Sequence, residues 1–288
     1  MTPSVDVVVV TYRSEATIGT AVEAVRRWPR CGQVIVVDNA SPDGSAAVAR
    51  EHADVVVVRP SNAGFGAAQN EGIRRAATDA VLLLNPDAVV DAAGLERGWQ
   101  VLEDDPAVAM VEGRIVRAVD GADERWYGRE PGLRALVARL LRLRERVGEQ
   151  ALQRAARACG VRDYAERRSQ VDQDVDFLAA VAPLVRVAAF DAVGGFDERI
   201  FLYAEDVQLC HRLSALGWRL RALAGPWATH LGGASSSGHE STRDRLWWSS
   251  HRVLVDTTWR GPRRTAGLLV ATVGVRQAER RSRSEVAA

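Results

Sequence analysis

Lysine is absent from this chain of 288 residues, and cysteine is scarce. Without lysine, mechanisms that require a lysine Schiff base or a P-loop lysine are excluded. Three widely spaced cysteines, Cys31, Cys159 and Cys210, form no CxxC pair, which argues against a disulfide framework or a cysteine zinc site. This cysteine usage fits a reducing cytosol.

Long apolar runs are also lacking. No stretch of about 18 or more apolar residues occurs, and the N-terminus shows no basic region followed by an apolar one. We therefore expect a cytoplasmic protein without a membrane span. The net charge of +1 argues against a general nucleic-acid binder, and 47% hydrophobic residues suffice for one large domain, or one domain plus an appendage.

The N-terminal third alternates between short apolar runs and helix-like segments. Four runs predict strands covered on both faces: Val7 to Val10, Val34 to Val37, Val55 to Val58 and Val81 to Leu84. The helical segments expected between them are Glu15 to Trp28, Ser45 to His52 and Ala67 to Ala77. Right-handed crossovers would bring the carboxyl ends of these parallel strands to one edge, where open α/β sheets bind ligands.

Asn85-Pro86-Asp87 ends the fourth apolar run abruptly and is the most informative feature of the sequence. Proline removes a backbone donor and stops the strand, so Asn85 and Asp87 are expected on a short, stiff turn at the carboxyl edge. A helix N-cap or a simple turn is an equal alternative for Asp87 taken alone.

Two more polar segments are expected at the same edge. Asp38-Asn39 follows the second strand, where a carboxylate can accept hydrogen bonds from a base or from ribose; a turn with an Asx cap is the alternative. The loop from Asn62 to Gly66, followed by Asn70, is glycine-rich and suits backbone approach to a phosphate or ribose. Most loops of this kind are only helix entries.

The second half begins with a helix expected over Ala92 to Glu103 and a strand over Val108 to Val116, and it is more mixed. Strand-like character returns at Asp176 to Val187. Glu205-Asp206 lies in the first turn of a helix expected over Ala204 to Leu216, where acids also complement the helix dipole. His230 follows a further apolar segment, and a lone histidine is more often a packed polar residue than a ligand.

A basic segment from Arg125 to Arg168 carries twelve arginines against five acidic residues. Leucines recur in it at helical spacing: Leu133, Leu136, Leu140 and Leu143. An amphipathic helix on an anionic membrane surface and a solvated insertion that packs on the core explain this pattern equally well. Three tryptophans in the expected helical tail leave the same choice between an interfacial belt and buried core: Trp247, Trp248 and Trp259.

The order of these motifs is more specific than any one of them. The chain resembles an inverting family 2 glycosyltransferase with a GT-A fold, in particular the bacterial rhamnosyltransferase-like branch. The resemblance covers about residues 5 to 235 through VVVVTYRSE, VIVVDNASPDGS, NAGFGAAQNEGI, LLLNPDA, VGGFDERIFLYAEDVQLCHRLSALGW and ATHLGG. It implies an α/β, Rossmann-like mixed sheet flanked by helices over residues 1–235, a basic helical insertion at about 125–170 and a C-terminal helical extension over 236–288.

The resemblance also implies roles for individual residues. Asp206 matches the catalytic base, with Glu205 orienting it or the acceptor. Asp87 and His230 match ligands of Mg²⁺ or Mn²⁺, the hard cations that stabilise a leaving diphosphate. Nucleotide-sugar contacts are implied for Thr11, Tyr12, Arg13, Glu15, Asp38, Asn39, Asn62, Gly64, Asn70, Asn85 and Pro86, and acceptor contacts for Phe196 and Asp197.

Three positions depart from the family pattern. Asn85 replaces the first carboxylate of the DxD metal motif, which weakens charge compensation of a metal. Arg13 replaces a commoner small polar residue, and Gln208 stands where many relatives have a further acid. Metal dependence is therefore expected to be weaker than in relatives with both carboxylates.

These features predict an enzyme that transfers L-rhamnose from dTDP-rhamnose, with inversion, to a cell-envelope polysaccharide or a polyprenyl-linked glycan. Peripheral contact with the cytoplasmic face of the inner membrane is part of this interpretation. A transferase for another UDP- or dTDP-hexose is the nearest alternative. A sugar-nucleotide-binding module without catalysis is the alternative from another class, and a nucleotidyltransferase ranks third because no glycine- and arginine-rich triphosphate loop is found near the N-terminus.

Overall fold

A computed structural model of the chain describes residues 4–124, 127–128, 131–148, 151, 154, 171–232 and 240–286. Half of the basic segment, including Trp126, lies outside these residues. So do Cys159 and Gly233, and so does the domain boundary expected between residues 235 and 236.

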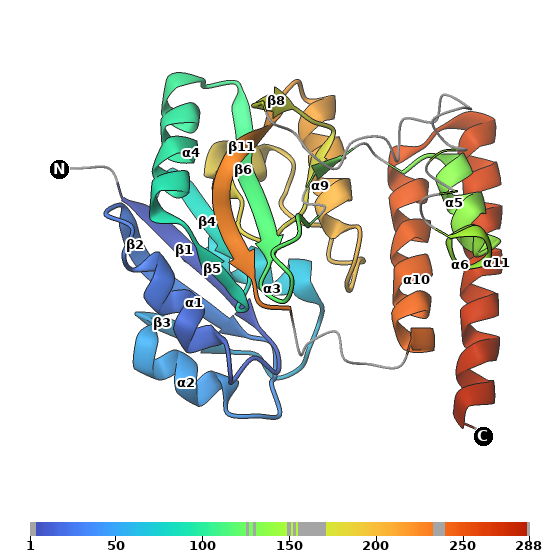
Figure 1. Ribbon diagram of the computed structural model, residues 1–288, viewed down its shortest axis with the longest axis horizontal. Helices are drawn as coiled ribbons and strands as arrows, with labels where there is room; N and C mark the ends of the chain where they lie inside the picture. The colour runs from blue at the N-terminus through green and yellow to red at the C-terminus, as the bar shows by residue number, and fades with distance from the viewer. Residues whose placement is uncertain are drawn as a thin grey trace.

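Within the described residues, a nine-stranded mixed sheet lies at the centre of the larger part of the molecule (Figure 1). Its order is β3-β2-β1-β4-β10-β6-β11-β5, with β8 pairing on β11. The strands are β1 (Val5–Thr11), β2 (Cys31–Asp38), β3 (Val55–Val58), β4 (Ala80–Leu84), β5 (Ala88–Val90), β6 (Val108–Arg117), β8 (Gln173–Asp174), β10 (Leu184–Arg186) and β11 (Arg219–His230). A small separate sheet pairs β7 (Tyr127–Gly128) with β9 (Phe177–Leu178).

The predicted parallel half of this sheet is confirmed. Strand β1 pairs in parallel with β2 and β4, and β2 pairs in parallel with β3. Their continuous apolar runs reflect cover on both faces, since every residue of β1 and of β4 is buried. Beyond β4 the sheet becomes mixed, because β10 runs antiparallel to β4 and β6 while β11 runs parallel to β6.

Helices flank the sheet, as Figure 1 shows. They are α1 (Ile18–Val25), α2 (Ser45–His52), α3 (Phe65–Ile73), α4 (Ala92–Asp104), α8 (Val187–Ala192) and α9 (Glu205–Ala215). Two of the predicted helices, Glu15 to Trp28 and Ala67 to Ala77, have different bounds in the structure. The chain makes a turn at Ser14 before α1, so this helix begins later than Glu15. Helix α3 begins at Phe65 rather than at Ala67, directly after Gly64 with its φ of 99°.

Four further helices lie together beside the sheet (Figure 1): α5 (Leu133–Leu140), α6 (Leu143–Val147), α10 (Glu240–Thr258) and α11 (Gly261–Val286). Gly261, with a φ of 56°, lies at the sharp turn between α10 and α11. A separate apolar cluster joins α5 to these two long helices: Leu136, Trp248, Val255, Trp259, Ala271 and Ala278.

This cluster decides between the alternatives for Leu136, Trp248 and Trp259. Leu136 is 1% exposed, and Trp248 and Trp259 are 4% and 3% exposed, so the interfacial-belt interpretation is wrong for these two tryptophans. The long amphipathic helix is also interrupted, because Arg142 adopts a φ of 50° between α5 and α6. No helix in the described ranges combines the length and apolar composition that a membrane crossing requires.

Candidate active site

Thr11 and Asp38 stand opposite each other at the carboxyl ends of β1 and β2. Both side chains are buried, and among the described residues Thr11 Oγ1 and Asp38 Oδ1 find no hydrogen-bond partner. The other carboxylate oxygen, Asp38 Oδ2, accepts from the Ser41 amide at 3.1 Å. Buried polar atoms without partners are unfavourable, so a polar ligand at this edge would satisfy them.

Asn39 links this edge to the glycine-rich loop. Its Nδ2 donates to Asn62 Oδ1 at 2.8 Å and to the Gly64 carbonyl at 3.1 Å, and Asn62 Oδ1 also accepts from the Gly64 amide at 3.0 Å. Gly64 has a φ of 99°, and a Cβ there would lie 2.6 Å from the Phe201 carbonyl oxygen. Only glycine fits at this position, where the loop from Asn62 to Gly66 meets Phe201 in the second half of the chain.

Arg13 and Glu15 contact the loop that precedes α2. Glu15 accepts a hydrogen bond from the Gly44 amide at 3.0 Å, and the Arg13 amide donates to Ser41 Oγ at 3.2 Å. Arg13 is exposed, has a φ of 56°, and its guanidinium lies 5.5 Å from the Tyr12 ring centroid. These contacts fix the loop, and the exposed guanidinium stands at the same sheet edge.

Asn85-Pro86-Asp87 leaves the sheet as expected, since β4 ends at Leu84 and β5 begins at Ala88. The Asn85 amide donates to the Val181 carbonyl at 2.8 Å. The Asp87 carbonyl accepts from the Leu231 amide at 2.8 Å, which joins this turn to the end of β11.

His230 therefore lies beside Asp87, from which sequence separates it widely. Its Nε2 is 3.1 Å from Asp87 Oδ1, and its Nδ1 is 2.9 Å from Glu124 Oε2. Hydrogen bonds to these two carboxylates raise the pKa of His230 to about 10, although burial opposes the shift. Glu124 was missed by sequence reasoning because it stands in an irregular segment with no pattern of its own.

Asp87 and His230 fit two positions in the coordination shell of a divalent cation, and substrate atoms would complete that shell. The 3.1 Å contact is a hydrogen bond, so His230 would have to lose its Nε2 proton before both residues could bind a cation. No group of three or more acidic, histidine or cysteine side chains in the described ranges is arranged to hold a metal. The pair suits the mode in which one carboxylate and substrate phosphates share the ion, not an all-protein cage.

Glu205 and Asp206 form the first turn of α9. Glu205 is buried, and its Oε2 lacks a hydrogen-bond partner in the described part of the chain, whereas Asp206 is partly exposed. Burial, and then the charge of Asp206, raise the pKa of Glu205 to about 8. Burial also raises the pKa of Asp206 to about 6, against hydrogen bonds from the Val207 and Ala180 amides. Burial raises the pKa of both carboxyl groups, and Asp206 is the more exposed of the two.

Glu112 on β6 is a third acidic residue of this region, and sequence reasoning did not select it. It is fully buried, Oε1 accepts from the Ala182 amide at 2.7 Å, and Oε2 has no partner within the described residues. Burial raises the pKa of Glu112 well above its usual range, and the charge of Asp206 adds to the shift. Glu112 is the single acid in the expected strand Val108 to Val116, and this was the available signal.

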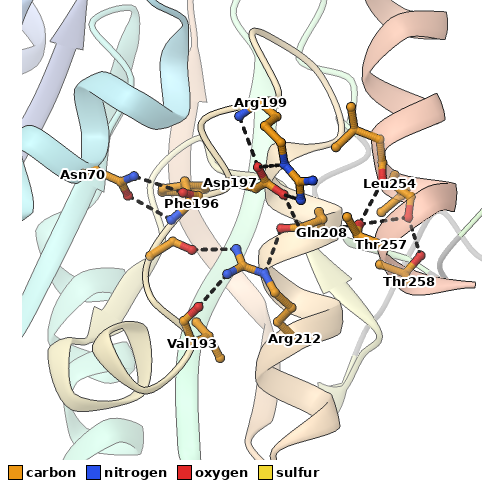
Figure 2. Close-up of polar contacts among 12 residues, drawn as sticks. Asn70, Val193, Phe196, Asp197, Arg199, Gln208, Arg212, Leu254, Thr257 and Thr258 are labelled. Carbon is orange, nitrogen blue, oxygen red and sulfur yellow. Dashed lines mark hydrogen bonds and ion pairs between the residues drawn. The ribbon is translucent and has the colours of Figure 1, made fainter.

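Asn70 and Phe196 satisfy each other across the two halves of the chain (Figure 2). Asn70 Nδ2 donates to the Phe196 carbonyl at 3.0 Å, and Asn70 Oδ1 accepts from the Phe196 amide at 2.8 Å. The Phe196 ring is 2% exposed and packs on Phe65 and Phe190. The sequence predicts that Asn70 and Phe196 contact substrate. In the structure, the two residues connect α3 to the turn before α9.

Arg212 of α9 fixes the same turn (Figure 2). Its guanidinium donates to the carbonyl oxygens of Val193 at 2.6 Å and Gly195 at 2.5 Å, and its Nε donates to Gln208 Oε1 at 2.9 Å. An amide side chain can accept from Arg212 and still donate elsewhere, which a carboxylate cannot do.

Gln208 uses that second capacity. Its Nε2 donates to Asp197 Oδ2 at 3.3 Å and to Thr257 Oγ1 of α10 at 3.4 Å (Figure 2). Asp197 also forms a two-pronged ion pair with Arg199, and this hydrogen bonding lowers the pKa of Asp197.

The candidate site residues lie in three groups: the Thr11–Asp38 edge with its loop, the Asp87–His230 pair and the carboxylates of α9.

Comparison with known proteins shows the family of this chain. Residues 6–163, more than half of the chain, match the family described as Glycosyl transferase family 2. The chain belongs to this family, and its fold is the mixed α/β fold of the GT-A type.

Two relatives come from Mycobacterium tuberculosis (strain ATCC 25618 / H37Rv). The chain is 32% identical over 200 residues to the pre-mycofactocin glycosyltransferase, a match that covers 66% of this chain and 35% of that protein. The chain thus spans little more than a third of that relative's length. It is 29% identical over 238 residues to N-acetylglucosaminyl-diphospho-decaprenol L-rhamnosyltransferase, covering 76% of this chain and 73% of that protein.

A solved structure agrees in fold. The mannosyltransferase of Pyrobaculum calidifontis in complex with GDP-Man and Mn²⁺ superposes with a TM-score of 0.57 at 18% identity, covering 99% of this chain and 76% of that one. At this identity the likeness shows the fold alone.

Proposed function

We propose that this glycosyltransferase transfers L-rhamnose from dTDP-rhamnose, with inversion, to a polyprenyl-linked glycan or cell-envelope polysaccharide. The observation that carries the proposal is the carboxylate pair at the start of α9, where Asp206 is partly exposed and Glu205 is buried beside it. The likeness to an L-rhamnosyltransferase acting on a decaprenol-linked sugar supports the choice of donor and acceptor.

The nucleotide of the donor binds at the Thr11–Asp38 edge. Asp38 Oδ1 accepts from the pyrimidine imide, and Thr11 Oγ1 and Asn39 Oδ1 supply further buried polar atoms without partners in the described chain. Asn62, Gly64 and neighbouring backbone close on the ribose and phosphates, while Arg13, Asn85 and Pro86 line the diphosphate side.

The transfer is a single displacement at the anomeric carbon. The acceptor oxygen forms a bond to this carbon as the bond to the diphosphate oxygen breaks, and the electron pair leaves with the nucleoside diphosphate. Asp206 takes the proton of the acceptor hydroxyl, a role suited to a base with a pKa of about 6. Glu205 and Asp197 orient the acceptor from the protein side.

Asp87 and His230 would bind Mg²⁺ or Mn²⁺ together with the donor phosphates. The cation supplies positive charge for the leaving diphosphate. A single protein carboxylate at this point gives less charge compensation than a complete DxD motif, because Asn85 is neutral.

Contact with an anionic membrane would bring the enzyme to a lipid-linked acceptor at the cytoplasmic face. Arg134 and Arg146 of the α5–α6 region are exposed, and so are Leu141 and Val147, at 45% and 54%. Basic and apolar side chains exposed together favour binding to anionic lipid. Cosedimentation with anionic vesicles, falling as salt rises, tests this part.

The donor is tested with the purified chain and a panel of dTDP- and UDP-sugars. We expect dTDP-rhamnose to give a glycosylated product and free dTDP with a lipid-linked N-acetylglucosamine acceptor. Thermal stabilisation by nucleotides without product or donor hydrolysis would instead indicate a binding module, the outcome that the neutral Asn85 and Gln208 would favour.

A further inference from the structure

The four residues Phe201 to Ala204 lead directly into α9, and the last two adopt an unfavourable backbone. Tyr203 and Ala204 have φ values of 70° and 67°, so two consecutive residues with side chains occupy the left-handed region. Such a conformation persists only when its surroundings enforce it. Glu205 and Asp206 follow at once, so this segment sets the direction in which both carboxylates point.

The donor-binding loop fixes one side of the segment. The Phe65 amide donates to the Phe201 carbonyl at 2.9 Å, and Gly64 is pressed against the Phe201 backbone. These contacts secure the first residue of the segment, but they do not reach the left-handed pair.

Helix α10 fixes the other side. Ser250 Oγ donates to the Leu202 carbonyl at 2.7 Å, immediately before the left-handed pair. Leu254, one turn further along α10 and 1% exposed, packs on Ala204 and Val207 in a small apolar cluster of its own. Both contacts come from one face of the helix, since residues four apart lie together.

We propose that Ser250 and Leu254 are positioning residues for the catalytic base, acting through the Phe201–Ala204 segment. The inference rests on the proposed role of Asp206. It assigns α10 a function in catalysis, although the helix lies outside the sheet and contributes no side chain to the reacting groups. A displacement of about 1 Å at a base is sufficient to reduce turnover about 100-fold.

The same helix supplies matched controls. Val255 is fully buried but faces the separate cluster shared with α5 and α11, so Val255→Ala removes a comparable apolar contact without touching the segment. Ser249 precedes Ser250 and is partly exposed, so Ser249→Ala controls for Ser250→Ala. Leu254→Met retains apolar volume and is the conservative rescue variant.

The test measures kcat, donor KM and nucleotide affinity for these variants of the full chain. We expect Leu254→Ala to lower kcat about 10- to 100-fold and Ser250→Ala about 3- to 10-fold, with donor KM and nucleotide Kd within about twofold. Val255→Ala, Ser249→Ala and Leu254→Met should retain kcat within about threefold, even where Val255→Ala lowers the Tm as much as Leu254→Ala does.

Equal kcat losses in Leu254→Ala and Val255→Ala would overturn the proposal, because a general loss of stability would then suffice. If Leu254→Ala does not fold, the pair Ser250→Ala and Ser249→Ala decides. Asp206→Asn is measured in parallel. Active Asp206→Asn would refute the base assignment and this inference together, whereas inactive Asp206→Asn with normal Ser250→Ala and Leu254→Ala would refute the inference alone.

Discussion

His230 Nε2 lies 3.1 Å from Asp87 Oδ1, although 143 positions separate the two residues in the chain. Antiparallel pairing of β5 with β11 brings them together, since His230 is the register partner of Ala88. The strand exit and the histidine, each ambiguous alone, therefore belong to one group. This contact forms a pH-dependent ion pair, which a bound cation would have to replace.

The ion pair predicts a pH-dependent stability. The pKa of His230 in the folded state is about 10, above the ordinary value of 6.5. The protonated imidazole therefore contributes its full stabilisation of the metal-free fold below pH 6.5. The contribution is lost as pH rises towards 10. Thermal unfolding in chelator should show the wild type losing its advantage over His230→Gln across this window. A difference in Tm that stays constant from pH 6 to 10 would contradict the ion pair.

Removal of the metal carboxylate should impair both binding and transfer. Asp87→Asn is expected to weaken Mn²⁺ binding and to lower transfer about 10- to 100-fold, because the pair loses its charged ligand. Titration of Mn²⁺ followed by electron paramagnetic resonance in the presence of dTDP measures binding directly. Unchanged Mn²⁺ affinity, or full transfer by the wild type in EDTA, would remove the metal from the account.

Gly64 is predicted to tolerate no side chain. Gly64→Ala combines a left-handed backbone with a Cβ 2.6 Å from the Phe201 carbonyl oxygen, so it should cost about 2–4 kcal/mol and weaken nucleotide binding. Gly121→Ala is the control, because Gly121 has a φ of 64° but nothing within 4 Å of the added Cβ. Chemical unfolding should therefore show a smaller loss, of about 1 kcal/mol, for Gly121→Ala. Equal losses would mean that the contact with Phe201 is unimportant.

Glu112 is predicted to be protonated in the folded enzyme. Burial raises the pKa of Glu112 in the folded state. Above pH 4.5 the carboxyl group ionises in the unfolded chain but stays protonated in the folded one, so the stability of the fold decreases as pH rises. Glu112→Gln keeps an oxygen for the Ala182 amide and cannot ionise, so its stability relative to the wild type should improve between pH 5 and pH 8. Urea unfolding at both values measures this. A variant that is less stable relative to wild type at pH 8 than at pH 5 would contradict the prediction.

Local pattern was sufficient for the parallel half of the fold. The valine runs and the polar residues that end them locate Thr11, Asp38 and Asp87, because a strand buried on both faces must be continuously apolar. The α9 helix was equally accessible, since Glu205, Asp206 and the apolar spacing after them are a local signal.

Long-range contacts account for what the sequence did not reveal. Glu124 meets His230, and Glu112 meets the loop at Ala182, only after strands far apart in the chain have paired. Trp248 and Trp259 were ambiguous because their spacing is the same whether a helix faces lipid or other helices. Their cover, α5 and α11, comes from two separate parts of the sequence.

The identity of the catalytic base is the central claim, and transfer by Asp206→Asn tests it most directly. The substitution keeps shape but removes the proton acceptor, so turnover should fall by about 10² to 10⁴ while nucleotide affinity stays near that of the wild type. Glu205→Gln, measured beside it, should retain nucleotide binding as well. Near-normal turnover by Asp206→Asn would contradict the account.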